Sequence, residues 1–252
     1  MTPQTILITG ATSGIGLGLA ARLHAQGHRL ILTGRRQALL DQAVAAHPGM
    51  TGYRNDIADP AQIAGLAARL AKDNPDLSTV ILNAGIMQAE RLGSNPTPLA
   101  IAEDTIATNL LGPIRLTHAL MPQLLAQPQA RIITVSSGLA FVPLAVTPTY
   151  SATKAAIHSW TQSLRFQLQD TSIRVHELAP PAVQTDLMPG QRTSPHAMPF
   201  EDFIDEVMSI LAQDPIPDEI LVERVGFLRR AETEGRHAAT FETLNQNFRG
   251  PD

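Results

Sequence analysis

Tyr150 and Lys154 lie four positions apart in the stretch PTYSATKAAIHSW, which spans residues 148–160. The chain contains two tyrosines and two lysines in 252 residues, and its other basic positions are mostly arginine. On a helix this spacing places both side chains on one face. A phenol has a pKa of about 10 and exchanges protons poorly near neutral pH, whereas a lysine ammonium beside it lowers that pKa by up to about three units. The pair predicts a proton-transfer site, and the alternative is a buried tyrosine beside a lysine that reaches solvent.

A glycine-rich turn follows the first strand-like run. The sequence TGATSGIGLGLA places Gly10, Gly14 and Gly16 before a segment of helical period. Glycines allow a sharp turn and a close approach to a pyrophosphate, whose charge meets the positive N-terminus of the helix. The spacing differs from the common G-x-G-x-x-G. The turn predicts a nucleotide site, and the alternative is an ordinary strand-to-helix connection.

The residues after the second strand-like run indicate which dinucleotide would bind. A dinucleotide-binding chain usually has an acidic residue about 20 positions beyond the glycines, where it holds the adenosine ribose. The sequence LTGRRQ has Gly34, Arg35 and Arg36 there instead. A missing carboxylate and two guanidinium groups favour a 2′-phosphate, so we expect NADP(H) rather than NAD(H). The alternative is a solvated arginine pair that begins a helix.

Further polar residues stand at predicted strand ends or inside a helix. Asp56, Asn83 and Ser137 follow strand-like runs, where each could equally be a turn or cap residue. Asn109 lies in the helical stretch EDTIATNLLGPIRLTHALM, and Pro113, four positions later, has no N–H. The Asn109 carbonyl therefore lacks its helical donor and could hold a water, the alternative being a simple kink at the proline.

The order of the predicted elements indicates how these residues meet. Strand-like runs at 5–9, 29–33, 79–82, 131–135 and 173–178 alternate with helical segments near 15–26, 37–46, 60–73, 101–125 and 150–168. This alternation predicts an α/β fold, a doubly wound parallel sheet with helices on both faces. Ligands bind such sheets beyond the carboxyl ends of the strands. We expect one domain over residues 1–252, with a substrate loop near 186–200 in a Pro-rich, polar region.

Composition and charge narrow the classes of partner. Nineteen basic and 23 acidic residues give a net charge of −4 without charged blocks, so nucleic acid is not expected as a partner. The sequence has no long apolar run and no signal-peptide pattern, so we expect no membrane partner and a cytoplasmic location. The absence of cysteine excludes disulfides, thiolate metal sites and a cysteine nucleophile, and we expect no bound metal.

Together these motifs resemble the short-chain dehydrogenase/reductase family, in its single-domain branch with a Rossmann-type fold. TGATSGIG, NAG, the Asn109 segment, SS and YSATK occur in the family's order and spacing over nearly the whole chain. By that resemblance Ser137 would bind the substrate oxygen, and Tyr150 would donate or accept the proton. Lys154 would hold the nicotinamide ribose and lower the Tyr150 pKa, while the Asn109 carbonyl would order a water in the proton relay.

The resemblance also implies a set of cofactor contacts. The glycine-rich loop would hold the pyrophosphate, the residues after the third and fourth strands would hold the adenine and ribose, and those after the sixth would hold the nicotinamide carboxamide. The expected cofactor-binding residues are Thr9, Gly10, Thr12, Ser13, Gly14, Ile15, Gly16, Arg35, Arg36, Asp56, Ile57, Asn83, Ala84, Gly85, Tyr150, Lys154, Pro180, Val183 and Thr185.

One departure from the family lies in the sequence APPAVQTDL, where Pro180 is followed by Pro181 rather than by the usual glycine. Proline cannot adopt a positive φ or donate a hydrogen bond, which leaves the path of the loop over the nicotinamide open. The Pro-Pro pair, TGRR and the ending ILVERVGFLRRAE are similar to the branch of the family named for D-alanine esterification of teichoic acids.

The resemblance implies an oxidoreductase that interconverts a carbonyl and an alcohol by hydride transfer with NADPH, in the direction of reduction. The alternative is a non-catalytic NADP(H)-binding sensor or interaction protein on the same fold. The stretches GLAFVPLAV and MPGQRTSPHAMPF would line the substrate pocket, and their few charges favour a neutral, medium-sized carbonyl compound. Arg192 and His196 in the second stretch could bind an acid group or remain solvated.

An apolar stripe on the segment that carries Tyr150 bears on assembly. Family members are usually homodimers or homotetramers, so we expect a homo-oligomer. The stripe could form such an interface or cover the sheet, and it consists of Ala156, Trp160, Leu164 and Leu168.

Overall fold

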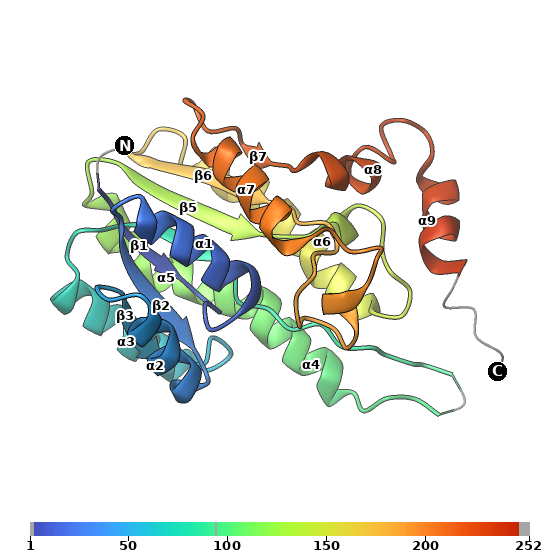
Figure 1. Ribbon diagram of the computed structural model, residues 1–252, viewed down its shortest axis with the longest axis horizontal. Helices are drawn as coiled ribbons and strands as arrows, with labels where there is room; N and C mark the ends of the chain where they lie inside the picture. Colours follow the sequence, from blue (N-terminus) through green and yellow to red (C-terminus); the bar gives the residue numbers. More distant parts are fainter. Residues whose placement is uncertain (1–2, 94, 247–252) are drawn as a thin grey trace.

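The computed structural model describes residues 3–93 and 95–246, and a seven-stranded parallel β-sheet forms their centre (Figure 1). The strand order is β3-β2-β1-β4-β5-β6-β7, so the chain begins in the middle, runs to one edge and then crosses to the other. This reversal places a topological switch point between β1 and β4, where sheets of this kind bind ligands. The strands are β1 (Thr5–Ile8), β2 (Arg29–Gly34), β3 (Thr51–Arg54), β4 (Leu77–Leu82), β5 (Ala130–Val135), β6 (Ile173–Leu178) and β7 (Glu219–Ile220).

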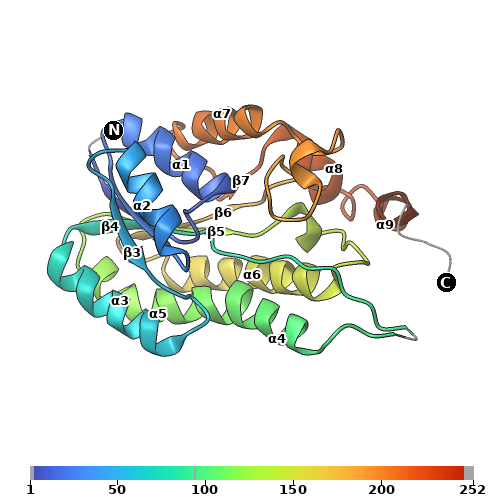
Figure 2. The same ribbon diagram turned by 60° about the horizontal axis from the view of Figure 1, so that its bottom comes forward.

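Helices cover both faces of the sheet (Figure 2). One layer contains α1 (Gly14–Ala25), α2 (Gln37–Ala46) and α7 (Phe200–Leu211), and the other contains α3 (Pro60–Asp73), α4 (Ala100–Ile106), α5 (Gly112–Leu125) and α6 (Pro148–Gln167). Alternate side chains of each strand point to opposite layers, so Ile8 packs with α1 and α7 while Leu7 packs with α3 and α5. Both faces are therefore apolar, which is why the strands read as continuous apolar runs. The predicted fold class is confirmed.

The segment predicted as one helix over 101–125 contains a π-helical turn from Ala107 to Leu111. It joins α4 to α5, and the N–H of Gly112 donates to the carbonyl of Ala107, five positions back. Pro113 follows at once and cannot donate to the Asn109 carbonyl. The wider turn passes the proline without ending the helix, so the prediction of a continuous segment holds while its regularity does not.

A third strand was expected before Asp56, as β3 shows, whereas α7, β7, α8 and α9 were not predicted. β3 and β7 are short strands at the two edges of the sheet, and β7 has only two residues. After α7 the chain forms α8 (Gly226–Arg229) and α9 (His237–Asn245), which lie beyond the carboxyl ends of the strands in Figure 1. In the described part of the chain no helix is long and apolar enough to cross a membrane.

Candidate active site

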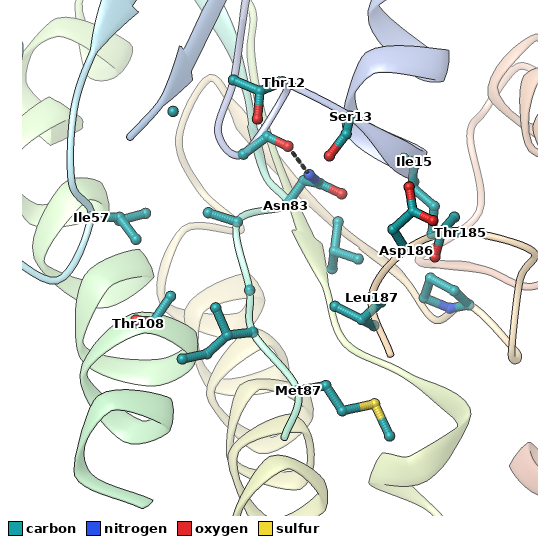
Figure 3. A pocket seen from close by; sticks show the side chains of 18 of the residues that line it. Thr12, Ser13, Ile15, Ile57, Asn83, Met87, Thr108, Thr185, Asp186 and Leu187 are labelled. Atoms are coloured by element: carbon teal, nitrogen blue, oxygen red, sulfur yellow. Dashed lines mark hydrogen bonds between the residues drawn. The ribbon is translucent and has the colours of Figure 1, made fainter. Parts of the chain in front are cut away.

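Loops at the carboxyl ends of the strands surround a cleft of about 440 Å³, a size typical of small-molecule sites. Figure 3 shows Thr12 and Ser13 on one wall, Thr185, Asp186 and Leu187 on another, and Met87 on the chain that follows β4. The cleft brings together most of the residues predicted from the sequence. Those that line it are Gly10, Thr12, Ser13, Gly14, Ile15, Arg35, Arg36, Asp56, Ile57, Asn83, Ala84, Gly85, Ser137, Tyr150, Lys154, Pro180, Val183 and Thr185.

Thr9 and Gly16 do not line the cleft but stand behind its wall. Thr9 Oγ1 accepts hydrogen bonds from the N–H groups of Asn83 and Ala84, both at 3.0 Å. Asn83 Nδ2 in turn donates to the Thr9 carbonyl at 2.9 Å and to the Gly10 carbonyl at 3.2 Å. Figure 3 draws one of these bonds. A Cβ on Gly16 would lie 2.5 Å from Asn83 Nδ2, so only glycine permits this approach. These contacts tie the glycine-rich loop after β1 to the loop after β4.

The glycine-rich loop has the shape and the donors that a diphosphate requires. Gly14 has φ of +55°, which favours glycine, and it begins α1. Ser13, the residue before the helix, makes no side-chain capping hydrogen bond. The first N–H groups of α1 therefore have no cap from that side chain and form, with the helix dipole, a site for an anion.

One end of the cleft, here called the arginine end, is formed by Gly34, Arg35, Arg36 and Asn55. Arg36 Nη2 donates to Thr12 Oγ1 at 3.1 Å and to Ser13 Oγ at 3.3 Å, so the guanidinium lies over the glycine-rich loop. A Cβ on Gly34 would meet the Thr12 methyl at 2.5 Å. An acidic side chain at position 34 would therefore require Thr12 to move.

The floor of the arginine end holds polar groups that suit a purine. Asn55 is buried, and its Oδ1 has no hydrogen-bond partner in the described part of the chain. Its neighbour Asp56 is engaged locally, because Asp56 Oδ1 accepts from the N–H of Ala58 at 3.0 Å. A buried acceptor without a partner is costly, so Asn55 Oδ1 is available to a donor on a ligand, such as an exocyclic amino group.

The other end, here called the tyrosine end, contains Ser137, Tyr150 and Lys154, with 7%, 6% and 4% of their surfaces exposed. Burial raises the pKa of Tyr150 to about 12, and a hydrogen bond with Ser137 opposes the increase. Burial lowers the pKa of Lys154 to about 8, and the Glu177 carboxylate opposes the decrease. Lys154 Nζ donates to the Val135 carbonyl at 2.8 Å and lies 5.5 Å from the centre of the Tyr150 ring. The Tyr150 pKa is thus raised here, whereas we expected Lys154 to lower it, because burial outweighs the other effects.

The π-helical turn places Asn109 between two walls of the tyrosine end, although Asn109 does not line the cleft. Asn109 Oδ1 accepts from the N–H of Ile86 at 2.8 Å, and Asn109 Nδ2 donates to the Ile86 carbonyl at 2.9 Å and to Thr153 Oγ1 at 3.3 Å. The side chain therefore holds the chain after β4 against α6. We expected Asn109 to act through its carbonyl, and this role of its side chain was not predicted.

Comparison with known proteins identifies the family. The family model described as short chain dehydrogenase matches residues 4–195. The chain belongs to this family. The short-chain dehydrogenases are oxidoreductases, and the curated relatives of the present one are oxidoreductases as well, as the sequence predicted.

Two relatives and one solved structure illustrate the match. The chain is 39% identical over 249 residues to the uncharacterized oxidoreductase DltE of Bacillus subtilis, which covers 97% of this chain and 98% of the relative. It is 34% identical over 187 residues to serine 3-dehydrogenase of Agrobacterium fabrum, and the match covers 72% of this chain and 73% of that relative. A short-chain dehydrogenase from Sphingobium yanoikuyae, solved in complex with NADPH, superposes with a TM-score of 0.80 at 25% identity, covering 99% of this chain and 98% of that one.

The predicted substrate loop of this short-chain dehydrogenase is pinned at both ends. Val183 forms an isolated bridge with Met198, and the Met198 N–H donates to the Ala182 carbonyl at 2.7 Å. Inside the loop, Gln191 Nε2 donates to the Val183 carbonyl at 2.7 Å. Arg192 Nε donates to Asp186 Oδ1 at 2.6 Å, so this guanidinium is already paired with a carboxylate. The loop folds over the cleft mouth with Asp186, Leu187 and Gln191 facing in.

Several lining residues of this dehydrogenase were not singled out from the sequence. They are Thr33, Asn55, Ile86, Met87, Gln88, Thr108, Val135, Ser136, Asp186 and Leu187. Val135 and Ser136 adjoin Ser137, which was predicted, so their position was the available signal. Met87, Gln88 and Leu187 have side chains with no distinctive chemistry, and only the folded loops bring them to the cleft. Pro181 lines it while the Pro180 carbonyl accepts from the Gly138 N–H at 2.8 Å, which joins this loop to the one after β5.

Proposed function

We propose that this short-chain dehydrogenase binds NADP(H) in the cleft and reduces a ketone or aldehyde to an alcohol. The observation that carries the proposal is the buried group of Ser137, Tyr150 and Lys154 at one end of a cleft whose other end presents Arg36. When bound, the nicotinamide supplies the hydride for such a reduction.

The tyrosine end supplies the proton chemistry. With a pKa of about 12, Tyr150 is protonated throughout the physiological range, which suits the donor of a proton. A phenol is still a much stronger acid than an alcohol, so Tyr150 can protonate the oxygen of a carbonyl as that oxygen becomes an alkoxide. Ser137 donates a hydrogen bond to the same oxygen and stabilises its developing charge. Lys154 stabilises the phenolate that Tyr150 leaves behind.

The arginine end supports NADP(H) over NAD(H). Arg36 has donors directed at the wall where a 2′-phosphate would lie, and the Thr12 methyl occupies the space that a carboxylate side chain at position 34 would need. The dehydrogenase from Sphingobium yanoikuyae, which shares this fold over nearly the whole chain, carries NADPH.

The tyrosine end, where a substrate would lie beside Tyr150, favours a neutral compound. Around the tyrosine end the cleft is lined by Ile86, Met87, Gln88, Leu187 and Gln191. Arg192 is paired with Asp186, and His196 is exposed, so neither is directed at a substrate acid group. Among the described residues that line the tyrosine end, Lys154 is the one cation. A neutral carbonyl compound therefore fits this end better than an acid.

We also propose a homo-oligomer. Leu164 of α6 is buried in the core, and Trp160 and Leu168 pack against the same core. The apolar stripe therefore faces the sheet and covers it. The support comes instead from exposed apolar side chains on the same layer: Ile106, Leu111, Leu125 and Phe166. Light scattering after size-exclusion chromatography tests this proposal. The cytoplasmic location remains a prediction.

Fluorescence titration with NADPH and, separately, NADH tests the cofactor, and a panel of neutral ketones and aldehydes with NADPH then tests the reaction. We expect tighter binding of NADPH and oxidation of NADPH by members of the panel. Equal affinities would contradict the role of Arg36. Tight binding without turnover across the panel would favour a non-catalytic sensor.

A further inference from the structure

Glu177 on β6 is a fully buried carboxylate that the chemistry described above does not use. Each of its oxygens has one partner: Ser136 Oγ donates to Oε1 at 2.5 Å, and His158 Nδ1 lies 2.7 Å from Oε2. A buried charge is costly unless hydrogen bonds and an opposite charge compensate for it. The two hydrogen bonds are present, so the question is which cation compensates Glu177.

His158 holds Glu177 through a hydrogen bond, in which His158 Nδ1 lies 2.7 Å from Glu177 Oε2. On the other side of the ring, Gln162 Nε2 lies 3.1 Å from His158 Nε2. Phe141 packs edge-on against its ring, with the two centres 4.8 Å apart, which holds the ring in this orientation.

Arg229 on α8 is already matched by another acid. The β6–β7 register sets Glu177 beside Glu219, and Arg229 Nε and Nη2 donate to the two Glu219 oxygens at 2.8 and 2.9 Å. His158, Glu177 and Glu219 place ligand atoms within 4.8 Å of one another, a grouping that also suits a metal ion. Since Arg229 holds both oxygens of Glu219, a cation of the protein itself serves this position.

Lys154 is a buried cation on the same helix as His158. It lies one helical turn before His158 on the same face of α6, and its Nζ donates to the carbonyl of Val135, the residue before Ser136. Two adjacent residues of β5 and its loop thus connect Lys154 and Glu177: the Val135 carbonyl binds the ammonium and the Ser136 hydroxyl binds the carboxylate. Ser137, at the tyrosine end, comes next in the chain.

We propose that Glu177 is a positioning residue of the active site, whose carboxylate, fixed by Ser136 and His158, keeps the buried Lys154 side chain as an ammonium ion. Among the described residues, Tyr150 and Glu177 are the titratable groups that interact with Lys154. His158 on α6, Glu219 on β7 and Arg229 on α8 lie around Glu177. The pKa of Lys154 follows this arrangement, since burial lowers it and Glu177 raises it. The assignment rests on the proposed function only in treating Tyr150 and Lys154 as the reacting pair.

Because the chain has two lysines, the charge on Lys154 can be measured directly in the ligand-free protein. Protein labelled with ¹³C at the lysine Cε gives two signals, and Lys72→Arg identifies the one from Lys154. We expect the Lys154 signal to titrate near pH 8 in the wild type, and at least about one unit lower in Glu177→Gln, which removes the charge but keeps the shape.

Ser136→Ala is the matched control, because it removes a hydrogen bond to the same carboxylate while keeping the charge. Its Lys154 signal should titrate close to the wild-type midpoint. A purely structural Glu177 would leave the Glu177→Gln midpoint equal to that of the wild type, and this result would overturn the proposal.

A second experiment covers the case in which Glu177→Gln does not fold. In the Lys154→Met background, Glu177→Gln no longer leaves a cation without its counter-charge. The double variant should therefore fold even if Glu177→Gln alone does not. Where both fold, Glu177→Gln should lower the melting temperature less in the Lys154→Met background than in the wild type. Equal losses in both backgrounds, or failure of both to fold, would overturn the proposal. The lysine titration needs neither cofactor nor substrate, so it can succeed even if no carbonyl compound is reduced, and it can fail while turnover is found.

Discussion

Arg36 at the arginine end of the cleft is exposed and hydrogen-bonded to two hydroxyl groups, whereas Lys154 at the tyrosine end is buried and bonded to a backbone carbonyl. Water screens an exposed charge, which can select among ligands but shifts the pKa of its neighbours little. A buried charge is costly and strongly coupled to its surroundings. This difference supports our proposal that one end serves recognition and the other serves proton chemistry, and the following experiments test that separation.

The largest effect is expected from Tyr150→Phe at the tyrosine end. Removing the proton donor should reduce kcat by about 10²–10⁴-fold, while NADPH affinity changes little because the recognition end is intact. The measurement is steady-state kinetics together with a fluorescence titration. Tyr53→Phe is the matched control, since Tyr53 is the other tyrosine, equally buried, and its hydroxyl donates to Asn74 Oδ1 at 3.2 Å. That variant should remain active and lose about 1 kcal/mol of stability.

Arg36→Ala should weaken NADPH binding by about 10- to 100-fold and leave NADH binding nearly unchanged, because only NADPH has a 2′-phosphate for the guanidinium. Kd values from titrations at two salt concentrations provide the measurement. The loss should shrink at high salt, since Arg36 is exposed. Arg174→Ala is the control, because Arg174 lies at the amino end of β6 and the cleft lies at the carboxyl ends of the strands. This variant should bind both cofactors as the wild type does. An equal loss for NADPH and NADH would break the assignment of this end.

The two ends should also differ in their response to pH. Lys154 has a lowered pKa of about 8, so its ammonium is complete below that pH and is lost as the pH rises through it. If the ammonium holds the bound cofactor, NADPH affinity should fall by up to about tenfold per pH unit above pH 8. The guanidinium of an arginine keeps its charge over this range. Titrations from neutral to alkaline pH should therefore show a slope in the wild type and a flat line in Lys154→Met; parallel slopes would place the titrating group elsewhere.

The smallest effect is expected from Asn245→Ala on α9. Asn245 Oδ1 accepts from the Ala145 N–H at 2.6 Å, and its Nδ2 donates to the Pro143 carbonyl at 3.1 Å. These bonds hold the loop that leads from Ser137 into α6. The change should cost about 1–3 kcal/mol of unfolding free energy, measured by urea denaturation, with cofactor affinity unchanged. A loss of NADPH binding instead would show that the two ends are not separate.

The sequence predicted the sheet, and it predicted that Ser137, Tyr150 and Lys154 would meet at one site, because both leave local signals. Continuous apolar strands can lie only in a sheet covered on both faces, and the Tyr150–Lys154 spacing is meaningful on any helix. The prediction that Asn109 acts through its carbonyl followed from Pro113, but the bonds from its side chain to Ile86 and Thr153 depend on α6 and the β4 loop packing together. No pattern within one segment encodes such contacts.

Long-range charge effects were also beyond the sequence. We expected Lys154 to lower the Tyr150 pKa from their spacing alone, but burial dominates in the fold and raises it. Glu177 reads in the sequence as an ordinary residue of an apolar strand, and its neighbours Ser136, His158 and Glu219 come from three other elements. β7 was missed because two residues carry no period, although its register with β6 sets the charge balance behind Lys154.

The hydrogen bonds among Thr9, Asn83 and Ala84 have a thermodynamic consequence for ligand capture. They fix the glycine-rich loop against the neighbouring loop within the protein itself, so a ligand that enters does not have to order flexible glycines. The entropy of shaping this wall is lost once, during folding, rather than in every binding event. A cofactor that must enter and leave in each catalytic cycle can then be held by modest contacts and released quickly.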